Sequence, residues 1–380
     1  MQPSPYTPGS VAKETYGREK HMKNLQRELA FLAQFQKLVG RVSVFVGPRG
    51  VGKTSLLRAA QREAENIGIN TIFVTAGDGP FVQELMLALE ELSETWHTEA
   101  KDYFRGLIKN LRITLGGFSI EAPQTNDGAS RNLGRQLQEL LTSAGDNSSK
   151  KGKGLLILID EIQAADPEGM RAFAYAWQHM QAENPDLPAI TIAAGLSHAQ
   201  DAITDAVSFA ERFRYVYLSN LDGPAAQNAL TQPAKAQQVT WSETALSLAL
   251  SSAQGYPYFL QVIGDETWAD ANYPSAGYQI TEENVSNGLL EFNEIRQSFF
   301  RARWAKATPK EQEVLRAMAR LGGGRVSRSD IARELGVSTQ TLSQPRANLI
   351  DKGLVSSPEH GFLEFTAPGF AEYVLAVDGA

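Results

Sequence analysis

The fold of this chain is decided by the stretch Val42-Ser43-Val44-Phe45-Val46-Gly47-Pro48-Arg49-Gly50-Val51-Gly52-Lys53-Thr54. Its first part is apolar and rich in β-branched residues, which predicts a short buried strand. Its second part matches the pattern GxxxxGK[ST], and a helical pattern runs on from Ser55 to Ile67. A glycine-rich loop between a strand and a helix turns its N–H groups toward an anion, so the stretch predicts a phosphate-binding loop.

Each residue type in this loop has a chemical reason. Gly47, Gly50 and Gly52 allow backbone angles and a close approach that side chains would block. Lys53 is expected to reach the β- and γ-phosphates of ATP, and the hydroxyl of Thr54 is expected to hold Mg²⁺. The nucleotide-binding residues expected from the loop are Gly47, Pro48, Arg49, Gly50, Val51, Gly52, Lys53, Thr54 and Ser55.

A second motif supports the first. The most hydrophobic run of the chain, Leu155-Leu156-Ile157-Leu158-Ile159, ends in Asp160-Glu161. The carboxyl end of a parallel strand lies at the sheet edge where ligands bind. Asp160 is therefore expected to hold Mg²⁺, directly or through water, and Glu161 to activate the attacking water as general base. The alternative for Glu161 is that it only caps the next helix.

The order of elements predicts an α/β fold. Five apolar runs alternate with helical patterns up to Asn220, which implies the parallel sheet of a P-loop NTPase with helices on both faces. Beyond Asn220 the pattern is mainly helical. Two local features are also expected: a hairpin over residues 111–122 with its turn at Gly116-Gly117, and an exposed linker over residues 144–153.

The composition excludes several classes of protein. The chain has no cysteine, so it has no disulfide, thiolate zinc site or cysteine nucleophile. Its five histidines lack the spacing of a catalytic zinc site. The formal net charge of −7 argues against a basic nucleic-acid binder as a whole. The start MQPSPYTPGS is no secretory signal, and no apolar run approaches the ~20 residues that span a bilayer. We therefore expect a cytoplasmic protein without membrane contact.

The two nucleotide motifs together resemble those of the AAA+ superfamily. The segment Tyr16-Gly17-Arg18-Glu19 is similar to the "GRE" segment of origin-recognition-type AAA+ ATPases. That resemblance implies that Tyr16, Gly17 and Arg18 lie near the adenine base. The segment Gly255-Tyr256-Pro257 is similar to one in signal-transduction ATPases with numerous domains and in archaeal-type relatives of the origin-recognition group. There it opens a lid helix over the nucleotide, which implies that Pro257 belongs to the site.

The resemblance also implies roles for residues of the sensor and finger positions. Ser197, or else Thr191, stands where the family has its sensor-1 residue, and a simple loop serine is the alternative. Arg212, with Arg214 as second choice, stands where the family carries an arginine finger that acts on a neighbouring subunit. This role requires a homo-oligomer, and a surface salt bridge is the alternative. The usual sensor-2 arginine is missing beside Pro257, which suggests slow hydrolysis.

The C-terminal segment resembles a winged-helix domain. Thr308 is expected to cap a first helix with Pro309 and Glu311, and residues 327–336 and 338–352 to form a helix-turn-helix before a hairpin. By that resemblance residues 338–352 are a recognition helix for double-stranded DNA, which Pro345 should kink. The side chains that could meet DNA are Ser338, Thr339, Gln340, Thr341, Ser343, Gln344 and Arg346. Residues 305–380 carry as many acidic as basic groups, so a structural or protein-binding winged helix remains the alternative.

The sequence therefore predicts an AAA+ ATPase that couples its nucleotide state to assembly and to DNA binding. The alternative is a signal-transduction or regulatory switch whose winged helix is structural or binds protein. The expected domains are a flexible tail (1–13), a nucleotide-binding α/β domain (14–220), a helical lid (221–304) and a winged helix (305–380).

Overall fold

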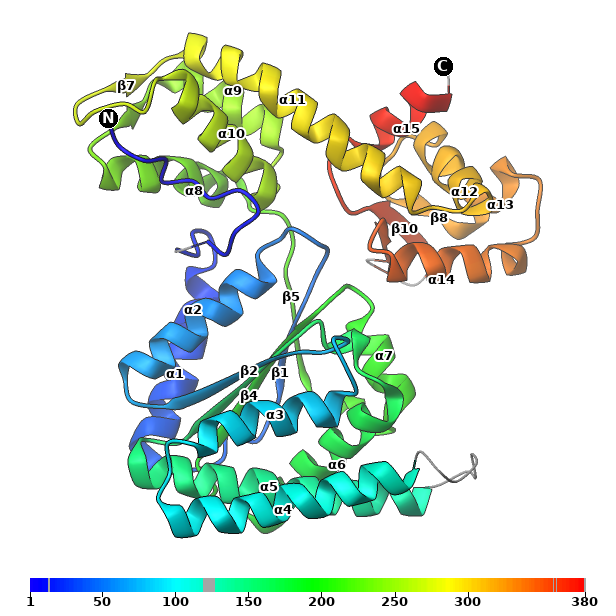
Figure 1. Ribbon diagram of the computed structural model, residues 1–380. Helices are drawn as coiled ribbons and strands as arrows, with labels where there is room; N and C mark the ends of the chain where they lie inside the picture. Colours follow the sequence, from blue (N-terminus) through cyan, green and yellow to red (C-terminus); the bar gives the residue numbers. More distant parts are fainter. Residues whose placement is uncertain (13, 119–126, 358, 360, 379–380) are drawn as a thin grey trace.

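The computed structural model describes residues 1–12, 14–118, 127–357, 359 and 361–378. Figure 1 shows a sheet covered by helices, a group of helices above it, and a further C-terminal group beside them. The long helix α11 (Glu282–Ala305) runs from the second group into the third. Among the described residues, no helix has both the length and the apolarity needed to cross a membrane.

The first group is built on a five-stranded parallel sheet, as the sequence predicted. Its strand order is β2-β3-β4-β1-β5. Both β3 and β4 are buried along their whole length, as expected of strands covered on both faces. The carboxyl ends of all these strands share one edge, and that edge carries the phosphate-binding loop. The strands are β1 (Ser43–Val46), β2 (Asn70–Thr75), β3 (Leu155–Asp160), β4 (Ala189–Gly195) and β5 (Arg214–Tyr217).

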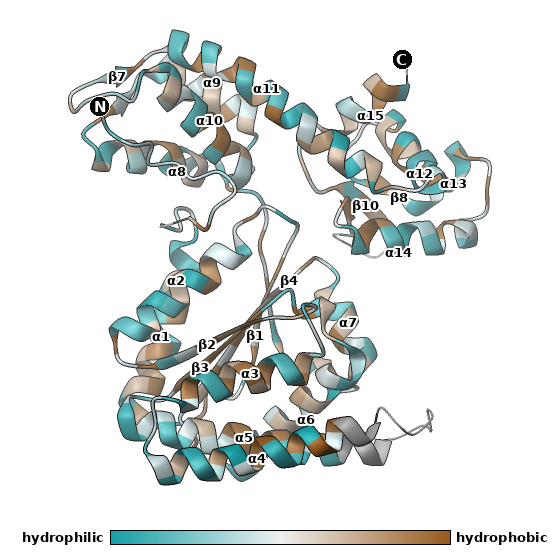
Figure 2. Cartoon of the chain, in the orientation of Figure 1, coloured by the Kyte–Doolittle hydropathy of each residue, from teal (hydrophilic) through white to brown (hydrophobic). Residues whose placement is uncertain are grey.

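Helices cover both faces of this sheet. Leu25, Leu29 and Leu32 form the buried stripe of α1, which packs with α2 on one face. On the other face α3, α5 and α6 pack on the sheet, with α7 at one side, and α4 lies against α3 and α5 (Figure 1). In Figure 2 the strands are brown and the outer helix faces teal, so the apolar surface is turned inward. The helices are α1 (Glu19–Phe35), α2 (Lys53–Asn66), α3 (Phe81–Ser93), α4 (Thr98–Phe118), α5 (Asp127–Lys151), α6 (Pro167–Glu183) and α7 (Ala199–Ala206).

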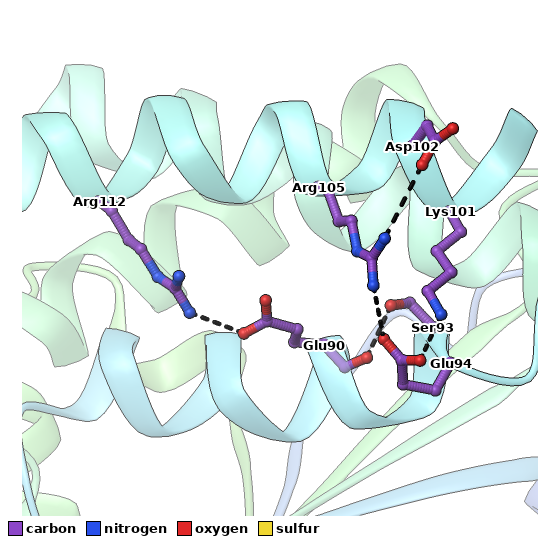
Figure 3. A network of polar contacts seen from close by, with 7 residues as sticks. All are labelled: Glu90, Ser93, Glu94, Lys101, Asp102, Arg105 and Arg112. Atoms are coloured by element: carbon purple, nitrogen blue, oxygen red, sulfur yellow. Dashed lines mark hydrogen bonds and ion pairs between the residues drawn. The ribbon is translucent and has the colours of Figure 1, made fainter. Parts of the chain in front are cut away.

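Polar contacts join α3 to α4 (Figure 3). The Nη2 atom of Arg112 lies 2.7 Å from the carboxylate of Glu90, and that of Arg105 lies 3.1 Å from the carboxylate of Glu94. These ion pairs are largely exposed, so each stabilises the fold by at most about 1 kcal/mol. Beneath them, Phe104, Ile108 and Leu111 of α4 are buried in the apolar core.

Two local expectations on this side of the sheet are wrong. No hairpin begins at Leu111, because α4 continues to Phe118 and buries Phe104, Ile108 and Leu111 at helical spacing. The rest of that hairpin, residues 119–122, lies outside the described residues. The linker expected over residues 144–153 is mostly helix, since α5 reaches Lys151. In both cases the burial of an apolar helical stripe stabilises helix more than the local glycine and polar residues disfavour it.

The N-terminal segment is not the flexible tail that its composition suggested. Residues 1–7 lie along α8 (Gly223–Ala236) and α10 (Pro257–Asp270), and the chain then runs down to α2, where the N–H of Ala12 donates to Ser55 (Figure 1). The side chain of Tyr6 is buried in the core of this second group, and its hydroxyl donates a 2.5 Å hydrogen bond to the carbonyl of Leu230. Trp268 donates from Nε1 to the carbonyl of Gln2 at 3.0 Å. Gly264 makes room for the ring, because a Cβ there would lie 2.6 Å from Tyr6 Cδ1.

The second and third groups share one hydrophobic core. The rings of Phe300 on α11 and Phe370 on α15 lie 5.4 Å apart within it. The second group is made of α8 (Gly223–Ala236), β6 (Thr240–Trp241), α9 (Glu243–Ala253), α10 (Pro257–Asp270), β7 (Gln279–Ile280) and α11. The third is made of α12 (Pro309–Arg320), β8 (Val326–Ser327), α13 (Arg328–Glu334), α14 (Ser343–Asp351), β9 (Val355–Ser356), β10 (Phe362–Phe365) and α15 (Phe370–Asp378).

The third group follows the order that the sequence predicted, with a three-stranded sheet β8-β10-β9. Thr308 and Glu311 form the expected capping box. The single helix expected over residues 338–352 is instead a 3₁₀ turn, η3 (Thr339–Leu342), followed by α14. Pro345 therefore stands in the first turn of α14, where its missing N–H has no role, and the expected kink is wrong.

Candidate functional site

The phosphate-binding loop joins β1 to α2 at the carboxyl edge of the sheet. Gly50 and Gly52 have φ angles of 82° and 91°, in the region that favours glycine. Gly47 is needed for another reason, because a Cβ there would lie 2.5 Å from the carbonyl oxygen of Leu218. The loop conformation thus follows from the glycines that the motif requires.

Lys53 lies over the loop from the first turn of α2. Its Nζ donates to the carbonyls of Gly47 at 2.9 Å and Pro48 at 2.8 Å. Burial lowers the pKa of Lys53 to about 8, although the nearby carboxylates of Glu161 and Asp160 act to raise it. The hydrogen bonds of this buried ammonium group go to neutral carbonyl oxygens. An anion bound beside Lys53 would therefore stabilise its charged form.

Thr54 and Asp160 meet across α2 and β3. The hydroxyl of Thr54 donates to Oδ2 of Asp160 at 2.6 Å. Burial raises the pKa of Asp160, and the hydrogen bonds from Thr54 and from the N–H of Glu161 oppose that effect. A hydroxyl and a carboxylate oxygen are the hard donors that Mg²⁺ takes, usually with water and phosphate completing its shell. These two residues therefore fit a magnesium ion shared with a nucleotide.

Glu161 follows directly with an unusual backbone. Its φ angle is 51°, which is uncommon for a residue with a side chain, and its N–H donates to Oδ1 of Asp160 at 2.9 Å. Glu161 stands at the N-cap of η1 (Ile162–Ala164) but makes no capping hydrogen bond with its side chain. Its carboxylate lines the same cavity as the phosphate-binding loop. This placement favours the chemical role over the capping alternative.

A cavity of about 360 Å³ lies against the loop. It is closed by the N-terminal segment, by the Tyr16–Arg18 region and by the start of α10. Its lining includes Thr7, Ser10, Tyr16, Arg18, Arg49, Lys53, Thr54, Ser55, Glu161, Pro257 and Tyr258. The sequence predicted most of these residues, but it assigned Thr7 and Ser10 to a loose tail.

Tyr16 and Arg18 line the cavity, and the three residues of the Tyr16-Gly17-Arg18 segment make different contacts. Tyr16 lines the wall. Gly17 packs so closely on α8 that a Cβ would lie 2.6 Å from that of Ala225. The buried guanidinium of Arg18 donates from Nη2 to the carbonyls of Val51 at 3.1 Å and Ser219 at 2.5 Å. Arg18 therefore fixes the loop to the chain that follows β5.

Tyr256 joins the second group to the loop, a contact that the sequence did not predict. It is fully buried and donates from its hydroxyl to the carbonyl of Arg49 at 2.6 Å. Gly50 leaves room for it, because a Cβ there would lie 2.2 Å from the hydroxyl oxygen. Pro257 follows as the first residue of α10 and lines the cavity. In the sequence, only the position of Pro257 within the segment Gly255-Tyr256-Pro257 indicated that it belongs to the site.

The C-terminal group also reaches the loop. The guanidinium of Arg303 on α11 donates to the carbonyl of Gly353 at 3.2 Å and lies 3.5 Å from the hydroxyl of Tyr256. Gly353 lies against Arg49, since a Cβ there would be 3.1 Å from Arg49 Nε. Hydrogen bonds thus run from Arg49 through Tyr256 and Arg303 to the end of α14.

The loop that follows β4 makes a second contact with the C-terminal group. The Nε2 atom of His198 lies 3.4 Å from Oδ1 of Asp351. Burial lowers the pKa of His198, while Asp351 acts to raise it. The residue just before it, Ser197, is not among the residues that line the cavity. Thr191 is buried in the middle of β4 opposite Ile157, so neither sensor-1 candidate reaches the cavity wall.

The finger candidates lie far from the chain's own loop. Arg212 is exposed on η2 (Ala210–Arg212), its guanidinium 5.9 Å from the ring centre of Phe209. It precedes the amino end of β5, so the length of that strand, about 13 Å, separates it from the loop edge. Arg214 pairs instead with Glu28 on α1. Of these two arginines, Arg214 is engaged in an ion pair and Arg212 is exposed beside the ring of Phe209.

The polar side chains proposed for DNA lie on an accessible surface. Ser338, Thr339, Gln340, Thr341, Ser343 and Gln344 are exposed, and Arg346 is half-buried. The neighbouring basic groups are engaged within the chain: Lys352 pairs with Glu311, Arg325 with Glu359 and Arg333 with Asp330. These pairs reduce the positive charge that the surface offers to a phosphate backbone.

Comparisons with known proteins agree with this geometry. Residues 14–190 match the model of the AAA ATPase domain, and residues 297–374 match a domain of unknown function, DUF8462. A search of curated proteins finds no match.

Solved structures share the fold along nearly the whole chain. A Walker-type ATPase of Pyrococcus abyssi is 17% identical with a TM-score of 0.60, covering 97% of this chain and 98% of its own. The ORC2 protein of Aeropyrum pernix, solved as ADPNP–ADP complexes, is 14% identical with a TM-score of 0.60, covering 99% and 98%. At these identities the likeness concerns the fold alone.

Proposed function

We propose that this protein is an AAA+ ATPase that binds ATP with magnesium and hydrolyses it at the cavity beside Lys53. The match of residues 14–190 to the model of the AAA ATPase domain supports this proposal. The observation that carries the proposal is the meeting of Lys53, Thr54, Asp160 and Glu161 at one sheet edge. Lys53, Thr54 and Glu161 line the cavity, and Asp160 lies behind them in hydrogen-bond contact with Thr54. An ammonium group, two hard oxygen donors and a carboxylate are the groups that phosphoryl transfer to water uses.

Each side chain has a task in this scheme. The N–H groups of the loop and Lys53 bind the phosphates and balance their charge. Thr54 and Asp160 would hold magnesium, which when bound adds positive charge against the phosphate oxygens. Glu161 accepts a proton from the attacking water. The adenosine part would lie between Tyr16, the N-terminal segment and Pro257.

The test of this reaction is the substitution Glu161→Gln. It keeps the size of the side chain and removes the base, so turnover should fall about 10²- to 10⁴-fold while ATP still binds. Turnover is measured as phosphate release, and affinity by calorimetry or a fluorescent nucleotide. Glu168→Gln, on the exposed start of α6, is the matched control. Unchanged turnover in Glu161→Gln would falsify the assignment of the base.

We also propose that the nucleotide state is passed to the C-terminal group, which we take to be a winged helix. The support is the path from Arg49 through Tyr256 and Arg303 to Gly353, because Arg49 lines the cavity and Gly353 lies in the turn directly after α14. A change at the phosphates can therefore bias how α14 is held. Arg212, exposed and distant from its own site, supports assembly in which it acts on a neighbour's nucleotide.

DNA is the partner that we propose for α14, and the internal ion pairs of Lys352, Arg325 and Arg333 favour a second candidate. In that second function the C-terminal group binds a protein, and the ATPase is a regulatory switch. A duplex-binding titration at several salt concentrations, with ATP and with ADP, separates the two. DNA binding predicts an affinity that falls with salt at a slope of about −0.9 per phosphate contact, and a fall on Arg346→Ala. If duplex affinity is weak even at low salt and changes neither with the nucleotide nor on Arg346→Ala, the result favours the regulatory switch.

A further inference from the structure

The carboxylate of Glu161 is held by a side chain that the reaction scheme does not yet use. Gln163, in the short helix η1, donates from Nε2 to Oε2 of Glu161 at 2.5 Å. The other end of the same amide, Oε1, accepts from the backbone N–H of Leu196 at 2.9 Å. One side chain therefore joins Glu161 to the end of β4.

The end of β4 is in turn fixed to the phosphate-binding loop. The carbonyl of Gly195 accepts from the N–H of Gly47 at 3.2 Å, and Gly195 pairs with Val46 in the sheet. Gly195 also makes the amide contact possible, because a Cβ there would lie 2.7 Å from Oε1 of Gln163. The contacts thus connect Glu161 to the first residue of the loop through Gln163 and two backbone groups.

This connection matters because Glu161 has little else to hold it. Its backbone is in the left-handed region, which costs a residue with a side chain about 1–2 kcal/mol. Its N–H is fixed by Asp160, but no contact other than that from Gln163 is described for its carboxylate. With Oε2 engaged by Gln163, Oε1 remains to meet a water molecule in the cavity.

We propose that Gln163 is the positioning residue for Glu161, setting the distance from its carboxylate to the phosphates by a fixed contact to the end of β4. It takes the place at β4 where a sensor-1 side chain was expected, since Ser197 and Thr191 do not reach the cavity wall. The inference rests on the proposed function, because it needs Glu161 to be the base. Gln163 acts through Glu161 and does not touch the nucleotide.

The test is Gln163→Met, which keeps the length of the side chain and removes both hydrogen bonds. A base that is displaced by a fraction of an ångström loses rate but not substrate, so kcat should fall about 10- to 100-fold with the Kd for ATP within twofold of wild type. Gln200→Met, on α7, is the matched control: it also loses one side-chain hydrogen bond, that from Tyr217, and should leave kcat unchanged. Thermal unfolding of both variants verifies that the fold is intact.

A double-mutant cycle separates positioning from a structural role. If Gln163 acts only through the carboxylate, Gln163→Met should cause no further loss in the Glu161→Gln background, as measured by single-turnover hydrolysis. Additive losses, an unchanged or increased kcat, or a fall in kcat that is matched by weaker ATP binding would each overturn the proposal. Full turnover in Glu161→Gln alone would instead refute the general-base assignment, so the two failures can be told apart.

Discussion

At the scale of single residues, Tyr256 shows how one hydroxyl connects separate parts of the chain. It is buried against Gly50, it donates to the carbonyl of Arg49, and it lies within reach of the guanidinium of Arg303. The guanidinium of Arg303 is buried and also donates to Gly353 and Thr366, whereas the carbonyl of Arg49 is only partly buried. The P-loop conformation is therefore set partly by a residue outside the P-loop domain.

Substitution of Tyr256 by Phe tests this dependence. The change leaves the ring in place and leaves the partly buried carbonyl of Arg49 and the buried guanidinium of Arg303 with one partner fewer, which costs about 1–3 kcal/mol. The melting temperature should fall and the affinity for ATP should weaken severalfold, as measured by thermal unfolding and nucleotide titration. Tyr103→Phe, at an exposed position on α4, is the control and should change neither. Equal behaviour of the two variants would show that the hydroxyl of Tyr256 is dispensable.

At the scale of elements, the N-terminal segment behaves as a structural part of the second group. Tyr6 occupies a space that Gly264 leaves open, and its ring lies edge-on to those of Trp241 and Trp268. Downstream of it, Thr7 and Ser10 line the cavity, and the N–H of Ala12 donates to Ser55. The segment therefore connects the buried anchor at Tyr6 to the nucleotide site.

Replacing Tyr6 with Ala should release this segment from the core. Loss of a large buried aromatic ring costs about 3–5 kcal/mol, and here the loss falls on one segment and its neighbours. Hydrogen exchange in residues 1–12 and in α10 should rise, and ATP should bind more weakly because part of the cavity wall is gone. Val11→Ala, on the exposed side of the segment, is the control. Unchanged exchange in Tyr6→Ala would mean that the segment is held by its polar contacts alone.

At the scale of the whole molecule, two contacts among the described residues connect the C-terminal group to the domain that carries the phosphate-binding loop. One is the contact of Gly353 with Arg49, and the other is the contact of His198 with Asp351. Both come from the end of α14 and the turn after it. Because the turn after α14 lies against the phosphate-binding loop, we expect α14 to respond to the nucleotide.

The substitution Gly353→Ala should weaken this contact. Gly353 has a φ angle of 67°, and a Cβ there would press on Arg49. We expect the ATP- and ADP-bound forms to lose their difference in limited proteolysis near α14, and in duplex affinity if DNA is the partner. Gly322→Ala controls for backbone strain, because Gly322 also has a positive φ but has open space around it. A nucleotide response that survives in Gly353→Ala as in Gly322→Ala would exclude this route of coupling.

The errors of sequence reasoning show where local signals stop being decisive. Gly116-Gly117 suggested a turn and residues 144–153 a linker, yet α4 continues through the first and α5 through most of the second. In both places a buried apolar stripe favours helix more strongly than glycine or serine disfavours it. The proline- and serine-rich start was misjudged for the same reason, because its one buried ring outweighs its composition.

The sequence by itself determined the parallel sheet, the phosphate-binding loop, the Asp160-Glu161 pair and the order of elements in the C-terminal group. These features depend on residues that are neighbours in the sequence, because a strand, a glycine loop and a helix start are each determined by local backbone chemistry. Only the tertiary structure brought Gln163 to Leu196, Tyr256 to Arg49 and Gly353 to the phosphate-binding loop. Such contacts join residues that are distant in the chain, and they require particular side-chain rotamers. Both depend on tertiary packing, which no local sequence pattern encodes.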